Sequence, residues 1–260
     1  MRASVDRGKI REHWDARAKQ FGIHPRATFN DLYLREMEIR NLWGFLDHDC
    51  LILDAGCGNG YATARFAEGF RSQFVGIDYS EEMIRCANEL KQRKGLSNVR
   101  FCVADFESLP FRSGLFDIVV TIRSLTNLPT WESQVRAISE LIRSLRPGGL
   151  LLMSEPSQQG LAGLNRVRRA FGLYELGSPW YNLYLDDEKL LEEFRGKLSL
   201  VEIRPYASTY YFGSRVIYPF ILGKRREPKY DSFLNRLFCR LPSVGRFGTQ
   251  RLYVFTKAAS

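Results

Sequence analysis

Three aspartates follow short apolar runs at positions that would suit a ligand site. Asp54 follows LIL, Asp78 ends QFVGID and Asp105 ends VRFCVAD. If the runs are parallel strands, their carboxyl ends meet at one edge of a sheet, and the three carboxylates then line one crevice. Carboxylates attract cations and accept hydrogen bonds from hydroxyl and amino groups. The crevice would therefore suit a positively charged ligand rich in hydroxyl groups.

A run of alternating glycines follows the first of these aspartates. Gly56, Gly58 and Gly60 stand in DAGCGNG, directly before a helical pattern. Glycine lets the backbone approach a ligand closely, and the free amides of a helix N-terminus converge there. A dinucleotide-binding loop has the spacing GxGxxG, but Tyr61 stands where its third glycine would fall. Because Asp54 also opposes a pyrophosphate, the pattern favours S-adenosylmethionine over a nicotinamide or flavin dinucleotide.

Each acid then has an expected role in the cofactor site. Asp78 is placed to accept hydrogen bonds from both ribose hydroxyls, and Asp105 from the adenine amino group beside the Phe106 amide. Both aspartates could also cap helices, since Ser80 and Glu107 follow closely, and the two roles can coexist. The expected cofactor contacts are Asp54, Gly56, Cys57, Gly58, Gly60, Asp78, Tyr79, Asp105, Phe106 and Arg123.

Polar residues also follow the apolar run FDIVVTI, in the segment RSLTN. Arg123 would lie at the mouth of the crevice, where a guanidinium can bind a carboxylate or phosphate through two hydrogen bonds. A structural ion pair with Glu155, at the end of the next strand, is an equally good interpretation. Asn127 would orient a substrate or cap the following loop.

Short β-rich runs alternate with helical patterns between residues 51 and 155. This alternation is typical of βαβ units, which build a mostly parallel sheet with helices on both faces. The expected strands are 51–55, 73–78, 99–105, 116–122 and 149–155, and the expected helices between them are 60–69, 80–94 and 131–145.

Further elements are expected at both ends of the chain. Helical patterns cover 7–21, 30–46, 161–171 and 186–194, and strands are expected at 198–206 and 251–258. Roughly forty residues rich in Tyr, Phe and Arg separate these two strands, too many for a simple connection. We expect them to form an inserted cap at about 207–250, with Tyr184 and Tyr210 as candidate substrate contacts.

Five motifs, taken together, resemble those of class I S-adenosylmethionine-dependent methyltransferases, and are most similar to the branch of ubiquinone/menaquinone-biosynthesis enzymes. The motifs are DAGCGNG, GIDYSEEM, ADFESLPF, FDIVVTIRSLTNL and LRPGGLLLMSEP, within about residues 50–156. The resemblance implies an α/β, Rossmann-like sheet of seven strands with the last one antiparallel, and S-adenosylhomocysteine as product. It also implies one domain, with a helical lid (1–48), a cofactor-binding core (49–156) and acceptor-binding elements (157–260).

Methyl transfer by in-line displacement needs few catalytic groups, because the sulfonium already activates the methyl group. A base is therefore difficult to identify, and His13, His24 and Glu155 are the candidates without a preference among them. The three histidines lack ligand-like spacing, and the acidic cluster of cation-dependent catechol methyltransferases is not recognisable, so no metal is expected.

The net charge of +9 is spread unevenly. Residues 201–260 hold 11 Lys/Arg and 3 Asp/Glu, so +8 of it belongs to the C-terminal segment. Basic residues there follow apolar ones in TYYFGSRVIYPFILGKRR, which would suit an anionic substrate, the surface of an anionic membrane or nucleic acid. Nucleic acid is the least expected partner, because no RNA-binding module is attached.

Five cysteines without a CxxC pair indicate reduced thiols, and neither a signal pattern nor eighteen consecutive apolar residues occur. We therefore expect a cytoplasmic methyltransferase, with at most peripheral membrane contact, acting on a small, sugar-linked or lipid-linked acceptor that could be anionic. The alternatives are an RNA or protein methyltransferase, an NAD-dependent oxidoreductase and a non-catalytic subunit that binds S-adenosylmethionine. No feature indicates the oligomeric state.

Overall fold

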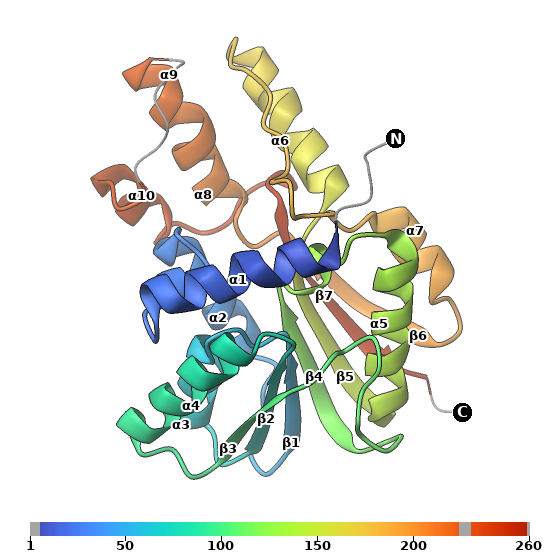
Figure 1. Cartoon of the computed structure of the whole chain (residues 1–260). Coiled ribbons are helices and arrows are strands. Elements are labelled where there is room, and N and C mark those ends of the chain that lie inside the picture. Colours follow the sequence, from blue (N-terminus) through green and yellow to red (C-terminus); the bar gives the residue numbers. More distant parts are fainter. Residues whose placement is uncertain (1–5, 224–229, 259–260) are drawn as a thin grey trace.

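The computed structural model describes residues 6–223 and 230–258. Its centre is a seven-stranded sheet in the order β3-β2-β1-β4-β5-β7-β6, with helices on both faces (Figure 1). Strand β7 runs antiparallel to both of its neighbours, whereas the other strand pairs are parallel. The mostly parallel, seven-stranded sheet expected from the sequence is confirmed.

The strands follow the apolar runs closely. Their bounds are β1 (Leu51–Ala55), β2 (Gln73–Asp78), β3 (Val99–Val103), β4 (Phe116–Ile122), β5 (Leu145–Pro156), β6 (Leu198–Arg204) and β7 (Gln250–Lys257). Strand β3 is two residues shorter than expected, since Asp105 instead accepts a hydrogen bond from the amide of Glu107 at 2.9 Å in a turn. Strand β5 begins earlier because Leu145 pairs with Phe116 before an irregularity in the register.

Alternate residues of β1 are buried in two separate hydrophobic clusters. Ile52 belongs to the cluster that includes residues of α2 (Leu32–Trp43), α3 (Tyr61–Gly69) and α4 (Glu81–Lys94). Leu53 belongs to the cluster that includes residues of α5 (Trp131–Ser144) and α7 (Asp187–Glu193). Because side chains alternate along a strand, the apolar run fills both faces of the sheet.

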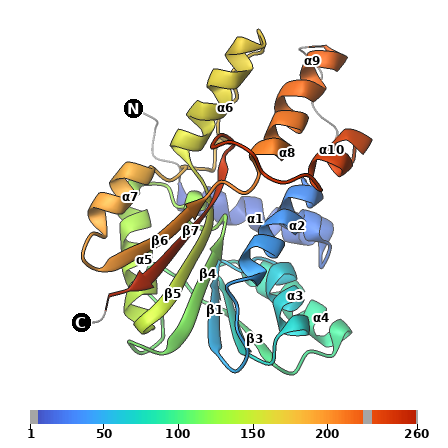
Figure 2. The same cartoon turned by 180° about the vertical axis from the view of Figure 1, so that it is seen from behind.

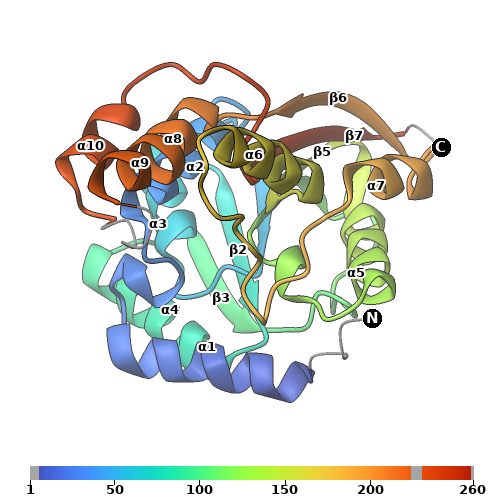
Figure 3. The ribbon, with the colours of Figure 1, turned by 90° about the horizontal axis from the view of Figure 1, so that it is seen from above.

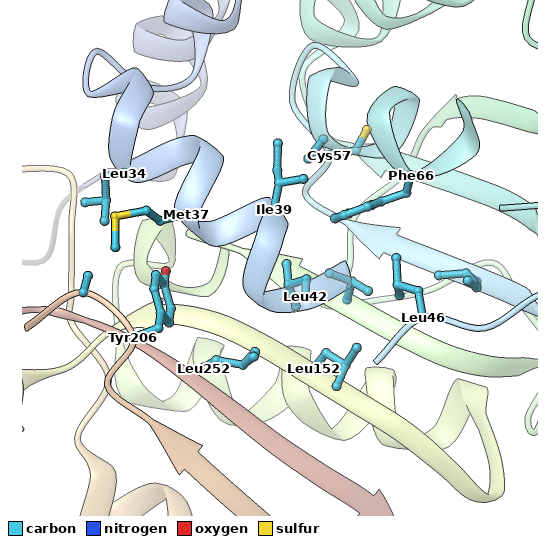
Figure 4. Packing of buried hydrophobic residues seen from close by; sticks show 14 of the residues in the cluster. Leu34, Met37, Ile39, Leu42, Leu46, Cys57, Phe66, Leu152, Tyr206 and Leu252 are labelled. Carbon is cyan, nitrogen blue, oxygen red and sulfur yellow. The ribbon is translucent and has the colours of Figure 1, made fainter. Parts of the chain in front are cut away.

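Helix α2 packs directly on the sheet. Asp31 caps its start by accepting a hydrogen bond from the amide of Leu34 at 3.2 Å. Met37, Ile39 and Leu42 then point into the first hydrophobic cluster (Figure 4). The helix is shorter at both ends than the 30–46 expected from the sequence.

Additional helices gather at the carboxyl edge of the central strands. Helix α1 (Arg7–Phe21) crosses this edge beside α4 (Figure 3). Helix α6 (Gln158–Ala170) stands on the same edge, next to the cap (Figure 2). The described cap consists of α8 (Ser208–Phe212), the π-helical segment η3 (Gly213–Ile217), α9 (Tyr218–Leu222) and α10 (Phe233–Phe238). The division into lid, core and acceptor-binding elements stays a prediction.

Candidate functional site

A cavity of about 330 Å³ opens at the carboxyl ends of β1, β2 and β4, and residues of α1, α6, α8 and η3 also line it. Many of the residues expected to contact ligand belong to its lining, namely Asp54, Gly56, Cys57, Gly58, Asp78, Tyr79, Phe106, Arg123, Asn127 and Tyr184. Others lie outside the described lining, namely Gly60, Asp105, Tyr210, His13, His24 and Glu155.

Asp54 is fully enclosed at the end of β1. Its Oδ2 accepts a hydrogen bond from the Thr63 hydroxyl at 2.6 Å, while its Oδ1 is buried without a partner among the described residues. Burial raises the pKa of this carboxyl to about 6. A lone carboxylate oxygen in a cavity is suited to an ammonium group, which would supply the missing hydrogen bond and the compensating charge.

The glycine loop after β1 needs its glycines for two reasons. Gly56 and Gly58 have φ of 79° and 56°, a region that other residues rarely adopt. A Cβ on Gly56 would lie 2.2 Å from the Cβ of Ser124, and one on Gly58 would lie 2.4 Å from the Cγ2 of Thr28. The loop therefore brings bare backbone close to the segment after β4. Gly60, with φ of 74°, begins α3 behind the loop.

Asp78 connects the glycine loop to α4. Its Oδ2 accepts from the Gly58 amide and its Oδ1 from the Ser80 amide, both at 2.9 Å. Burial raises the pKa of Asp78 to about 6. Because a carboxylate has about four acceptor positions, both oxygens can still accept hydrogen bonds from a ligand. Asp78 thus holds the turn and lines the cavity at the same time.

Asp105 lies at the rim, next to α1. It forms an ion pair with Arg7 at 2.6 Å, and Arg7 also pairs with Glu107 at 3.0 Å. The Arg7 guanidinium lies 5.7 Å from the centre of the Tyr79 ring. Arg7, Tyr79 and Phe106 line the cavity, so this contact holds the start of α1 over its rim.

The histidine candidates have structural contacts. His13 stacks on Tyr181 with ring centres 4.5 Å apart, and burial, followed by the charge of Arg17, lowers its pKa. His24 caps the short helix η1 (Pro25–Ala27) by accepting a hydrogen bond from the amide of Arg26 at 3.1 Å. Neither imidazole lines the described cavity, although Trp14, the neighbour of His13, does.

Glu155 supports the segment after β4. Its carboxylate accepts hydrogen bonds from the amides of Ser124, Leu125 and Thr126 at 3.0, 3.2 and 3.3 Å. Burial raises its pKa to about 7. These bonds fix the short helix η2 (Leu125–Asn127) and occupy the oxygens that an ion pair with an arginine would need.

Arg123 pairs with Glu38, which corrects the expected ion pair with Glu155. Its Nε lies 3.1 Å from Glu38 Oε1, and its guanidinium lies 3.4 Å from the centre of the Phe29 ring. Its backbone φ is 53°, which is unusual for a residue other than glycine. The Arg123 amide donates to the Ser154 carbonyl at 2.9 Å, and its own carbonyl accepts from Asn127 Nδ2 at 2.9 Å. Asn127 therefore fixes the backbone from which Arg123 enters the cavity.

Sequence reasoning missed a buried charged cluster on α2. Arg35 is 4% exposed and Glu38 is fully buried, although both stand in a helix rich in apolar residues. Burial, followed by the charge of Arg123, lowers the pKa of Arg35 to about 9, and burial raises that of Glu38. Gln250 of β7 donates a hydrogen bond to Glu38 Oε1. Charged residues within the apolar stripe of a helix are the signal that could have revealed the cluster.

A second buried pair joins the start of α2 to the cap. Arg215 Nη2 donates to Asp31 Oδ2 at 3.0 Å, and the Tyr210 hydroxyl donates to Asp31 Oδ1 at 2.6 Å. Arg215 lines the cavity, while Tyr210 lies behind it. Tyr211, next in sequence, lines the cavity and shares a hydrogen bond with Thr249.

Among residues 6–223 and 230–258, no group of three or more His, Cys, Asp or Glu residues is arranged to hold a metal ion. In the same part of the chain, every helix is too short or too polar to cross a membrane.

Comparison with protein families matches residues 46–188 to a methyltransferase domain. The ubiquinone/menaquinone biosynthesis C-methyltransferase UbiE of Idiomarina loihiensis is 31% identical over 150 residues, which are 54% of this chain and 58% of that protein. UbiE of Yersinia enterocolitica is 30% identical over 166 residues, or 59% of this chain and 65% of that protein. The chain thus spans about three fifths of the length of these curated relatives.

Solved structures share the fold. They include a complex of the Haloferax volcanii Trm112 methyltransferase activator with a putative methyltransferase (TM-score 0.62, 17% identity, 96% of this chain and 98% of that one). The [4+2]-cyclase SpnF has a TM-score of 0.60 at 23% identity, with 87% of this chain and 81% of that one covered. A SAM-dependent methyltransferase of Methanosarcina mazei has a TM-score of 0.57 at 22% identity, with 84% and 96% covered.

Proposed function

The chain belongs to the methyltransferase-domain family, and from that premise we propose that it transfers the methyl group of S-adenosylmethionine to an acceptor bound in the same cavity. One observation carries the proposal. One cavity contains Asp54, whose Oδ1 has no partner among the described residues, the glycine loop at Gly56 and Gly58, and the Asp78 carboxylate.

These residues match the parts of S-adenosylmethionine. The ammonium group suits Asp54 Oδ1, and the ribose hydroxyls suit the remaining acceptor positions of Asp78. Phe106 and Tyr79 of the lining would cover the adenine, and Asp105, which pairs with Arg7 at the rim, would accept a hydrogen bond from its amino group. When bound, the cofactor supplies a methyl group already activated by the positive sulfur.

The protein's part in the reaction is binding and alignment. The cavity is lined by Trp14 of α1 and by Tyr184 from the segment after α6. Both side chains would keep water from the reacting atoms. Binding both reactants in one enclosed space replaces a bimolecular encounter with an aligned displacement. Burial raises the pKa of Tyr181 in the lining, so its hydroxyl stays neutral and is suited to orient an acceptor by hydrogen bonding.

The acceptor that we propose is a small molecule, free or linked to a sugar or lipid, and anionic. Supporting the lipid-linked form, Phe220, Ile221 and Leu222 at the end of α9 are 54%, 65% and 42% exposed, and Phe233 of α10 is 78% exposed. Exposed apolar side chains on a basic segment would suit peripheral contact with an anionic membrane. More protein should then co-sediment with phosphatidylglycerol vesicles than with phosphatidylcholine vesicles, and Phe233→Ser should reduce this amount. Equal co-sedimentation with both kinds of vesicle would contradict the proposed membrane contact.

Calorimetry and labelling test the main proposal. We expect S-adenosylmethionine and S-adenosylhomocysteine to bind and NAD not to bind; tight binding of NAD alone would make the chain an oxidoreductase. Label from methyl-labelled S-adenosylmethionine should enter the small-molecule or lipid fraction of a cell extract. Label in RNA or protein would redirect the proposal to those acceptors, and cofactor binding without any labelled product would favour a non-catalytic subunit.

A further inference from the structure

The guanidinium of Arg123 lies in the cavity with unused hydrogen-bonding capacity. Its side chain is 13% exposed, and its Nε–H donates no hydrogen bond among the described residues, although Glu38 provides charge compensation at 3.1 Å. A buried donor without an acceptor costs about 1 to 3 kcal/mol, which a ligand oxygen could recover. The left-handed backbone of Arg123 adds local strain beside the same cavity.

Arg215 has a similar unused donor. One end of its guanidinium binds Asp31, but its Nη1 is buried without a partner in the described part of the chain. The side chain is 13% exposed, and the ring centre of Tyr230 lies 5.2 Å from its guanidinium. The pair with Asp31 therefore fixes the arginine from one side and leaves a second donor for another acceptor.

Helices α6 and α10 contact the segment that carries Arg215. It stands in η3, the π-helical turn between α8 and α9, and such turns are frequent at functional sites. Arg168 of α6 donates a hydrogen bond to the Arg215 carbonyl and is itself held by the Tyr174 carbonyl at 2.7 Å. A Cβ on Gly213 would lie 2.1 Å from Phe238 of α10, so η3 packs closely against that helix. A side chain placed by this much structure is suited to binding a ligand in a defined position.

Both arginines line the cavity, and Arg123 enters it away from Asp78. Strand β4 lies on the opposite side of β1 from β2, so Arg123 and Asp78 follow strands that flank Asp54 on either side. Tyr181 and Tyr230 also line the cavity, and the Tyr230 ring lies beside the Arg215 guanidinium.

We propose that Arg123 and Arg215 together bind an oxyanion, a carboxylate or a phosphate, on the methyl acceptor. Guanidinium groups match the geometry of both anions through paired hydrogen bonds. The aromatic side chains of Phe29, Tyr181 and Tyr230 in the same lining would contact an unsaturated or apolar part of that acceptor. The inference rests on the proposed function, since it assigns the remaining space to the acceptor of the transferred methyl group.

Three probes of similar size separate charge from shape. Phenyl phosphate, benzoate and benzyl alcohol are titrated calorimetrically into the protein, with and without saturating S-adenosylhomocysteine. We expect at least one anionic probe to bind about 10-fold or more tightly than benzyl alcohol, since a hydrogen bond to a charged group contributes about 1.5 to 3 kcal/mol. The anion that binds more tightly shows whether the acceptor carries a carboxylate or a phosphate. Equal binding of all three probes, or binding of none, would overturn the proposal.

Variants locate the binding. Arg215→Met and Arg123→Met should each weaken the favoured anion about 10-fold or more, and the exposed Arg246→Met is the matched control that should not. Since Arg215→Met leaves Asp31 buried without its cation, the double variant Asp31→Asn with Arg215→Met is measured as well. Anion binding that survives in a folded double variant would overturn the assignment of Arg215.

The carboxylate of the cofactor itself could instead bind the two arginines. Two nucleosides, one with this carboxylate and one without it, distinguish the two possibilities. S-adenosylhomocysteine carries that carboxylate, whereas 5′-methylthioadenosine lacks the whole amino-acid part. We expect Arg123→Met and Arg215→Met to leave the affinity of both within about twofold. A selective loss of S-adenosylhomocysteine affinity would transfer the arginines to the cofactor. Failure of S-adenosylhomocysteine to bind the unaltered protein would instead remove the proposed function, while anion selectivity could still be measured without it.

Discussion

The two halves of the cavity are built in different ways. Around Asp54 and Asp78, the two carboxylates accept hydrogen bonds from backbone amides and a hydroxyl that lie at most 20 positions away in the sequence. Around Arg123 and Arg215, ion pairs join α2 to β4 and to the cap, across 85 and 184 positions of sequence. The first half is a local motif, and the second exists only after the chain has folded.

This difference predicts different responses to mutation. In the half around Asp54 and Asp78, called the Asp54 half, neighbouring atoms leave no room for a side chain at Gly56 or Gly58. The carboxylates of this half remain available to a ligand. In the Arg123 half each charge has a buried counter-charge, so removing one residue leaves another uncompensated. Mutations of the carboxylates in the first half should therefore affect cofactor affinity, and mutations of its glycines should affect folding. Mutations in the second half should affect stability and acceptor binding.

The largest effect is expected for Gly56→Ala. The added methyl group would meet the Cβ of Ser124 at 2.2 Å in a backbone with φ of 79°, so strain and overpacking together should lower the free energy of unfolding by about 2 to 5 kcal/mol. Gly95→Ala is the matched control, because Gly95 is in the left-handed α region (φ 64°, ψ 30°) and an added Cβ would meet no atom of the described residues within 4 Å; strain alone should cost about 1 to 2 kcal/mol. Urea unfolding measures both, and equal losses would contradict the close packing at Gly56.

Glu38→Gln should have the next largest effect, in the Arg123 half. Removing the carboxylate leaves Arg35 and Arg123 without their shared counter-charge, which should lower the free energy of unfolding by about 3 kcal/mol. Adding Arg123→Met should restore part of the loss, while S-adenosylhomocysteine affinity stays within about twofold. A single variant as stable as the unaltered protein would show that the buried ion pair does not stabilise the fold.

Asp54→Asn should affect binding more than folding. Because the amide cannot compensate an ammonium group, S-adenosylhomocysteine affinity should fall by about 1.5 to 3 kcal/mol, measured by calorimetry. Stability should be equal or higher, since the unfavourable burial of a charge is removed. Unchanged affinity would place the amino group elsewhere.

The last prediction is the pH dependence of stability and of cofactor affinity in the Asp54 half. Burial raises the pKa of Asp54 and Asp78 from 3.8 to about 6, so between these values the folded state binds more protons than the unfolded state. Stability should therefore fall as pH rises from about 4 to about 6, by at most about 1.4 kcal/mol per pH unit for each group. Cofactor affinity should rise over the same interval, because the ammonium group favours ionised Asp54. Titrations at pH 5 and 7 check this, and affinity that falls with rising pH would contradict it.

The same contrast explains what the sequence could predict. Strands β1, β2 and β4 have the bounds expected from their apolar runs, because alternation and glycine turns are local signals. The pairs of Glu38 with Arg123 and of Asp31 with Arg215 depend on how α2 and the cap pack together, which no local pattern encodes. Likewise, the π-helical turn that carries Arg215 has no recognisable sequence signal, and the sequence wrongly offered Glu155 as the partner of Arg123.

A crystal structure of the complex with S-adenosylhomocysteine tests the central claim most directly. We predict that the ligand's amino group lies within about 3 Å of Asp54 Oδ1 and that its ribose hydroxyls reach Asp78, with the sulfur facing the space beside Arg123. A nucleoside bound outside this cavity, or an amino group directed away from Asp54, would contradict the account.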